Sequence, residues 1–105
     1  MKKELLASFS IENWVMDPGF GFGKTVQENF DIVKRLQELK VINLPILLGV
    51  SRKSSIYKTL GIGPEHALNG TTVLNTLGLL NGASILRVHD IKEAKQIIEL
   101  LPYLQ

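Results

Sequence analysis

Residues 46–54 read ILLGVSRKS, an apolar run that passes through a glycine into two adjacent basic residues. A run of this length, rich in branched side chains and free of polar alternation, is typical of a strand buried on both faces of a parallel sheet. Two comparable runs flank it along the chain, WVM at 14–16 and ILRV at 85–88. The three runs begin at positions 14, 46 and 85, so each interval is long enough for a helical crossover between parallel strands.

Helical patterns fill the intervals between these runs. Thr25 and Glu28 have the spacing of a capping box, and the helix that they open is predicted to end near Lys40. A short helix is predicted over 54–60, with Ser54 in position to cap it. Apolar residues recur at three-residue steps along one face of the first helix. They are Phe30, Val33, Leu36 and Leu39.

Three more helical segments follow from the same signals. A fragment over 2–7 precedes the first strand, and a helix rich in small residues is predicted over 71–80. Asp90 and Glu93 repeat the capping-box spacing at the start of the last helix, which Pro102 ends. The buried stripe of that last helix is predicted to consist of Ala94, Ile97, Ile98 and Leu101.

The order of elements predicts an α/β fold of three parallel strands, each followed by a helix and joined by right-handed crossovers. Three such units leave two sheet edges open, whereas a closed (β/α)₈ barrel needs eight units and about 250 residues. We therefore expect residues 1–105 to form a single partial domain of such a barrel. A small open α/β sheet is the alternative, but it would need strands that the sequence does not show.

Composition excludes several classes of protein. Of 105 residues, 45% are hydrophobic and 21% are charged, which argues against intrinsic disorder. Charged residues and glycines interrupt every apolar run before it reaches the length of a membrane span, and no signal peptide is visible. The absence of cysteine excludes disulfides and thiolate chemistry and fits a cytoplasmic location. A net charge of +2 is too mild to indicate nucleic-acid binding.

The first motif that carries chemistry is DPGFGFGKT at 17–25, directly after a strand and before a helix. Its glycines let the backbone approach a ligand, and the following helix start favours an anion. A P-loop would need a glycine five residues before Gly23, where the sequence has Pro18. A tight turn alone would not need Asp17 at a strand end or Lys24 after three glycines.

The second and third motifs are GVSRKS at 49–54 and RVHD at 87–90. Strand parity places Ser51 and Lys53 on one side and the intervening arginine on the other. Arg87 and His89 are two residues apart, so they project to the same face, where they suit an oxyanion or phosphate. For Asp90, the simpler interpretation is that it caps the last helix.

All three motifs lie at the C-terminal ends of predicted parallel strands, where α/β proteins place their ligand sites. The predicted site is positively charged and has one carboxylate. This balance suits an anionic ligand that also carries a neutral hydrogen-bonding ring. The residues assigned to the site on this basis are Asp17, Lys24, Ser51, Lys53, Arg87 and His89.

DPGFGFGKT, GVSRKS and LRVHD, in this order and spacing, resemble the C-terminal part of the dihydropteroate synthase family. The resemblance implies the last three βα units of a pterin-binding (β/α)₈ barrel. It also implies a transferase of folate biosynthesis that joins p-aminobenzoate to dihydropterin pyrophosphate, giving 7,8-dihydropteroate and pyrophosphate. The family's first strand and flexible loops, which carry an Asn that helps to bind Mg²⁺, have no counterpart here, so we expect the isolated chain to be weak or inactive.

The resemblance also implies roles for individual residues. Asp17 and Lys53 are expected to contact the pterin, and Arg87 and His89 to hold the pyrophosphate, with Arg87 also against the pterin. The residues expected to border the p-aminobenzoate site are Phe20, Lys24 and Ser51. Those expected to take part in catalysis are Lys53, Arg87 and His89.

Two further expectations concern partners. Open sheet edges predict that the chain joins the missing barrel units or associates with itself as a homo-oligomer, without nucleic acid or membrane. The alternative to an enzyme is a non-catalytic α/β module that binds an anion or a pterin at the same strand ends and self-associates.

Overall fold

The computed structural model describes residues 10–12, 15–21 and 24–105. The helical fragment predicted over 2–7 and the start of the first strand at Trp14 lie outside the described residues. The elements run in the order β1 Ser10–Glu12, β2 Val15–Asp17, α2 Val26–Lys34, a 3₁₀ helix Leu36–Ile42, β3 Leu47–Leu48, α3 Ser54–Leu60, a 3₁₀ helix Pro64–His66, α4 Leu68–Leu80, β4 Ile85–Leu86, α5 Ile91–Leu100 and a 3₁₀ helix Leu101–Tyr103.

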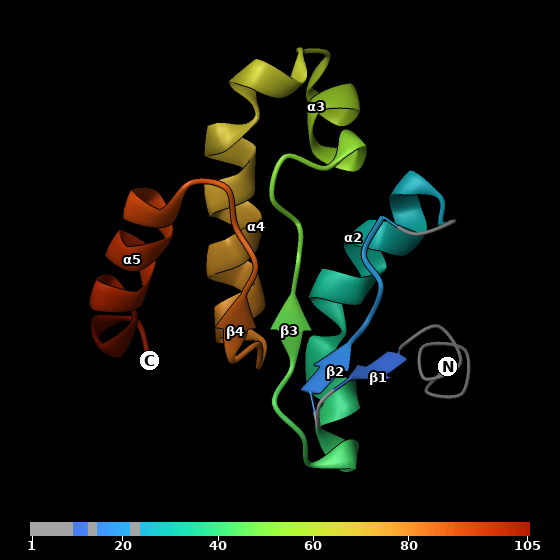
Figure 1. Ribbon diagram of the computed structural model, residues 1–105, viewed down its shortest axis with the longest axis vertical. Helices are drawn as coiled ribbons and strands as arrows, with labels where there is room; N and C mark the ends of the chain where they lie inside the picture. The colour runs from blue at the N-terminus through green and yellow to red at the C-terminus, as the bar shows by residue number, and fades with distance from the viewer. Residues whose placement is uncertain (1–9, 13–14, 22–23) are drawn as a thin grey trace.

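Three short strands lie parallel in the order of the sequence, as predicted. β3 and β4 pair in parallel, with Leu47 opposite Ile85. β2 joins them through a parallel bridge between Met16 and Ile46, and the Met16 backbone N–H donates to the Pro45 carbonyl at 2.9 Å. β1 was not predicted. It pairs with β2 in the antiparallel sense and extends the sheet on the side away from β3 (Figure 1).

The helices pack in chain order beside the strands. α2 contacts α4, and α4 contacts α5, so that α4 lies in the middle of the helical layer (Figure 1). The core lies between this layer and the strands. Its largest hydrophobic side chains that are at most 2% exposed are Met16, Phe20, Ile32, Leu36, Leu39, Ile46, Leu48 and Val50. Among the described residues, none of the helices has both the length and the apolar character needed to cross a bilayer.

The capping box at the start of α2 is confirmed. The Glu28 backbone N–H donates to Thr25 Oγ1 at 3.1 Å, and the Thr25 backbone N–H donates to Glu28 Oε1 at 2.8 Å. The second of these hydrogen bonds holds the pKa of Glu28 below its usual value. The predicted helix to Lys40 is wrong in detail, because α2 ends at Lys34 and the chain continues as a 3₁₀ helix over Leu36–Ile42.

Two other helix starts differ from the prediction. Ser54 does not cap α3; it is the first residue of that helix, and Lys53 occupies the cap position, where its side chain does not cap the helix. α4 begins at Leu68, three residues before the predicted start at position 71. In the last helix, Ala94 and Ile97 are buried as predicted, whereas Ile98 is 53% exposed.

Gly78 allows α4 to lie close to β3. A Cβ at this position would overlap Cδ2 of Leu48, which is fully buried. We expect Gly78→Ala to lower the free energy of unfolding by up to about 2 kcal/mol, because overpacking costs about 1–3 kcal/mol and the gain in helix propensity offsets about 1 kcal/mol of it. Urea denaturation measures the change. Leu77→Ala, at a half-exposed neighbouring position, is the control and should shift stability by less than about 1 kcal/mol. A stabilised Gly78→Ala chain would contradict this packing.

Candidate functional site

The loops that follow β2, β3 and β4 lie at the same end of the sheet, beyond the C-terminal ends of the strands, as the placement of the three motifs predicted (Figure 1). A pocket of about 240 Å³ opens between the last two loops. It brings together four of the predicted site residues and two of their neighbours. The lining residues are Gly49, Ser51, Lys53, Arg87, Val88 and His89.

Arg87 lines this pocket and reaches the first motif. A Cβ on Gly49 would lie 2.5 Å from Nη2 of Arg87, so the absence of a side chain at Gly49 makes room for the guanidinium. Nη1 of Arg87 lies 3.4 Å from Oδ2 of Asp17. The other oxygen of Asp17 accepts the backbone N–H of Gly19 at 2.9 Å. The anionic partner expected for Arg87 is therefore Asp17 in the free chain.

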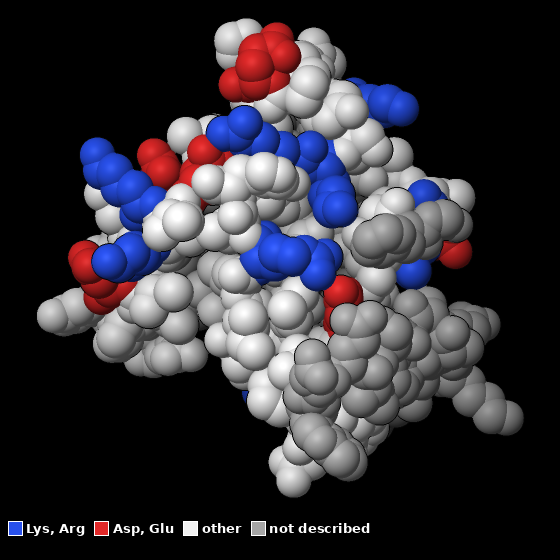
Figure 2. Space-filling view, viewed as in Figure 1, with Lys and Arg blue, Asp and Glu red and all other residues white. Residues whose placement is uncertain are grey.

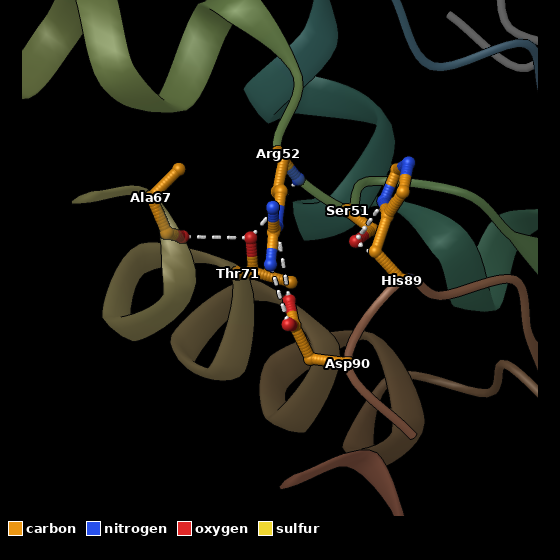
Figure 3. A network of polar contacts seen from close by, with 6 residues as sticks. All are labelled: Ser51, Arg52, Ala67, Thr71, His89 and Asp90. Carbon is orange, nitrogen blue, oxygen red and sulfur yellow. Dashed lines mark hydrogen bonds and ion pairs between the residues drawn. The ribbon is translucent and has the colours of Figure 1, made fainter. Parts of the chain in front are cut away.

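Ser51 fixes the orientation of His89. Its Oγ accepts the backbone N–H of His89 at 3.1 Å and lies 2.7 Å from Nδ1 of the same residue (Figure 3). When the imidazole is neutral and the hydroxyl donates to Nδ1, the ring proton sits on Nε2. Figure 3 shows this second nitrogen directed away from Ser51. His89 can therefore donate from Nε2 to an anion in the pocket.

Arg52 leaves the pocket side, as parity predicted, and pairs with Asp90. Nη2 donates to Oδ1 of Asp90 at 2.6 Å and Nε donates to Oδ2 at 3.2 Å (Figure 3). These hydrogen bonds, together with the opposite charges, lower the pKa of Asp90 and raise that of Arg52. Asp90 is the N-cap residue of α5 by position, as predicted, but its side chain makes no capping hydrogen bond. Its carboxylate is committed to Arg52 instead.

Phe20 and Lys24 lie in the first loop but are not among the residues that line this pocket. Phe20 is 2% exposed and packs in the hydrophobic core, so it anchors the loop after β2 to that core. Lys24 donates from Nζ to the Gly19 carbonyl at 3.1 Å. Both residues hold the loop that follows Asp17.

Asn29 is a residue of the site region that the sequence analysis missed. It is 2% exposed, accepts the Gly21 backbone N–H on Oδ1 at 2.8 Å, and donates from Nδ2 to Ser55 Oγ at 2.8 Å. Gly21 in turn contacts Lys53, because a Cβ there would lie 3.3 Å from the Lys53 Cδ. The available signal was a polar residue four positions before Val33, on the apolar face of the predicted helix.

The charge around the pocket is mainly positive. Lys53, Arg87 and His89 line it. Figure 2 shows Lys and Arg side chains gathered across the middle of the face in view. In the described part of the chain, no group of three or more His, Asp or Glu side chains is placed to hold a metal ion. The lining groups do not fit Mg²⁺, which prefers carboxylate and water oxygens. They do fit an oxyanion, which they can bind with charge-assisted hydrogen bonds.

A model of one protein family, described as "Pterin binding enzyme", matches residues 1–89. Among curated proteins, the chain is 40% identical over 95 residues to the dihydropteroate synthase of Escherichia coli K12, covering 90% of this chain and 34% of that protein. It is 36% identical over 104 residues to a bifunctional dihydropteroate synthase/dihydropteroate reductase of Helicobacter pylori, covering 99% and 27%. The chain thus spans between about a quarter and a third of the length of these relatives.

Solved structures give the same result in three dimensions. The 7,8-dihydropteroate synthase of Vibrio fischeri matches with a TM-score of 0.83 at 38% identity, over 86% of this chain and 33% of that one. A dihydropteroate synthase of Coxiella burnetii, solved in complex with pteroic acid, matches with a TM-score of 0.81 at 41% identity, over 86% and 34%. The three parallel strands and their helices therefore have the arrangement of part of a (β/α)₈ barrel, as predicted.

Proposed function

Because this chain belongs to the pterin binding enzyme family, we propose that it forms part of the active site of a dihydropteroate synthase. The reaction would join p-aminobenzoate to dihydropterin pyrophosphate and release pyrophosphate and 7,8-dihydropteroate. One observation carries the proposal: Lys53, Arg87 and His89 converge on one pocket at the strand ends. The carboxylate of Asp17 lies beside that pocket, next to Arg87.

The pocket residues suit the charges that develop in this reaction. The C–O bond between the pterin methylene and the pyrophosphate breaks, and its electron pair stays on the leaving oxygen. The aniline nitrogen then attacks the methylene carbon, forms the C–N bond and loses a proton. Arg87, His89 and Lys53 can stabilise the negative charge on the leaving pyrophosphate. Asp17 can accept hydrogen bonds from ring N–H groups of the pterin.

The remaining parts of the proposal concern residues and groups at the margins of the pocket. The p-aminobenzoate site is proposed to be bordered by Phe20, Lys24 and Ser51. Phe20 and Lys24 would act by supporting the loop after β2, and Ser51 as a lining residue of the pocket. Mg²⁺ belongs to the proposal as a partner of the substrate's pyrophosphate. No described residue is assigned to the metal, because the pocket presents cations rather than carboxylates.

We also propose that the sheet gains strands from elsewhere. β4 pairs with β3, and at the strand's start Ile85 is 38% exposed. Bare parallel edges recruit further strands, and a barrel closes them. The partner is either the other βα units of a barrel or a second copy of the chain, and the proposed location of the assembly is the cytoplasm.

The proposal predicts that the 105-residue chain binds both inorganic pyrophosphate and pteroic acid but shows little or no turnover, because it spans a third of its relatives' length. Calorimetry measures the binding, and a steady-state assay with p-aminobenzoate and dihydropterin pyrophosphate measures turnover. Lys58→Ala removes a cation from the exposed side of α3, away from the pocket, and should leave binding unchanged.

The outcomes separate the enzyme from a plain binding module. Turnover that appears when the other barrel units are added, in one chain or as a separate chain, supports the enzyme. Binding of pyrophosphate without pteroic acid, and no turnover in either form, favours a non-catalytic anion-binding module. Failure to bind either ligand would contradict both functions.

A further inference from the structure

Two consecutive residues of one loop hold two consecutive residues of another. In the loop after β3, Ser51 hydrogen-bonds His89, and Arg52 makes two hydrogen bonds to Asp90 in the loop after β4 (Figure 3). The two pairs lie on different sides of the loops. Ser51 and His89 line the pocket, whereas Arg52 and Asp90 are not among its lining residues. The ion pair therefore joins the two loops outside the pocket lining.

The backbone at Arg52 is built to make this pairing. Its φ is +54°, in the left-handed region that residues with a side chain rarely adopt. Its backbone N–H donates to Oγ1 of Thr71 at 3.0 Å, and that hydroxyl donates to the Ala67 carbonyl at 2.7 Å (Figure 3). Thr71 is 2% exposed. The start of α4 thus holds the turn in the conformation that sends Arg52 towards Asp90.

We propose that Arg52 and Asp90 are positioning residues for the anion pocket: their ion pair sets the distance between the loop that carries Lys53 and the loop that carries Arg87 and His89. This inference deepens the proposed function and rests on it for the identity of the anion. Lys53 follows Arg52 directly, and His89 directly precedes Asp90. A change in the spacing of the ion pair therefore moves the two cationic walls of the pocket relative to each other.

Asp90→Asn distinguishes a positioning role from a purely electrostatic one, because the two predict changes of opposite sign in the affinity for an anion. Removal of a negative charge near a cationic pocket should strengthen the binding of an anion if only long-range charge matters. Loss of the bidentate pair should weaken it if the pair positions the loops. We expect inorganic pyrophosphate to bind about 10-fold more weakly, the scale known for partners that orient ligand-binding side chains in metal sites. Tighter binding would overturn the proposal.

A charge-reversed double variant tests the pair as a unit. Arg52→Asp with Asp90→Arg keeps the net charge and places opposite charges on the same two loops. We expect each single substitution to weaken pyrophosphate binding and the double variant to recover part of the loss. Lys58→Ala serves again as the control away from the pocket. Additive losses in the double variant, with no recovery, would show that the pair does not act as a unit and would contradict its positioning role.

A measurement without ligand keeps this test separate from the proposed function. The ¹⁵N signals of the His89 ring report the hydrogen bond between Nδ1 and Ser51. In Asp90→Asn we expect these signals to shift towards those of a free imidazole, while the melting temperature stays close to that of the parent chain. If the parent chain fails to bind pyrophosphate, the proposed function is wrong, and the ring signals still decide the positioning role. Unchanged ring signals would overturn it.

Discussion

Replacement of Arg87 by alanine is expected to weaken the binding of inorganic pyrophosphate by roughly 10- to 150-fold, which corresponds to about 1.5–3 kcal/mol for lost hydrogen bonds to a charged group. The guanidinium lines the pocket together with Lys53 and His89. Its side chain is 52% exposed, so the expected loss stays below that of a fully buried pair. Calorimetric titration of the parent and variant chains measures the effect.

Gly49→Ala perturbs the position of the Arg87 guanidinium without removing its charge. A Cβ at this position would lie 2.5 Å from Nη2 and 2.9 Å from Cζ of Arg87, so the guanidinium has to move. Gly49 is not among the described glycines with positive φ, so alanine imposes no backbone strain there. We expect pyrophosphate binding to weaken in the same direction as in Arg87→Ala. A large fall in stability with unchanged affinity would contradict this placement of the guanidinium.

Asp17→Asn should produce the opposite pattern. The carboxylate lies 3.4 Å from Arg87 and competes with an incoming anion for the guanidinium. Its removal should leave pyrophosphate binding unchanged or stronger, whereas pteroic acid should bind more weakly, because the amide presents the ring with a donor where an acceptor is needed. If Arg87→Ala and Asp17→Asn weakened both ligands equally, the division of labour between pyrophosphate and pterin would be wrong.

The strand ends were predictable because the signals for them are local. Each motif directly follows a short apolar run, and residues two apart project to one side. Arg87 and His89 do line the same pocket, although both lie beyond the end of β4. The parity argument also separated Ser51 from Arg52, although both lie in a turn beyond the end of β3. There the left-handed φ of Arg52, rather than a pleated strand, produces the separation.

Long-range partners account for most of what the sequence did not reveal. Asp90 and Glu93 have the spacing of a capping box, but Arg52, 38 residues away along the chain, takes the carboxylate. Nothing local to either residue indicates that choice. β1 is three residues long and gives too few positions for a periodic pattern.

The break after α2 had no clear signal in the sequence either. Phe30, Val33, Leu36 and Leu39 follow one another at intervals of three, but the first two lie in the α-helix α2 and the last two in the 3₁₀ helix Leu36–Ile42. Leu36 and Leu39 are fully buried. The spacing thus predicted the buried face but not the change in the type of helix.

Asn29→Ala is expected to lower the free energy of unfolding by roughly 2–4 kcal/mol, because one or two buried polar groups lose their partner at about 1–3 kcal/mol each. One amide accepts the Gly21 N–H and donates to Ser55, which is 4% exposed. It thus joins the loop after β2 to the first turn of α3. Urea denaturation measures the loss, and Asn69→Ala, on the exposed face of α4, is the matched control.

The exchange of the Gly21 amide hydrogen shows whether Asn29 also holds the first loop. In Asn29→Ala this amide should exchange faster than in the parent chain, whereas in Ser55→Ala it should keep its protection because Oδ1 of Asn29 remains in place. Lys53 packs against Gly21, so a released loop should also weaken pyrophosphate binding. Equal protection of the Gly21 amide in the parent and Asn29→Ala chains would show that the loop is held by its glycines and by Phe20 in the core, and not by this amide.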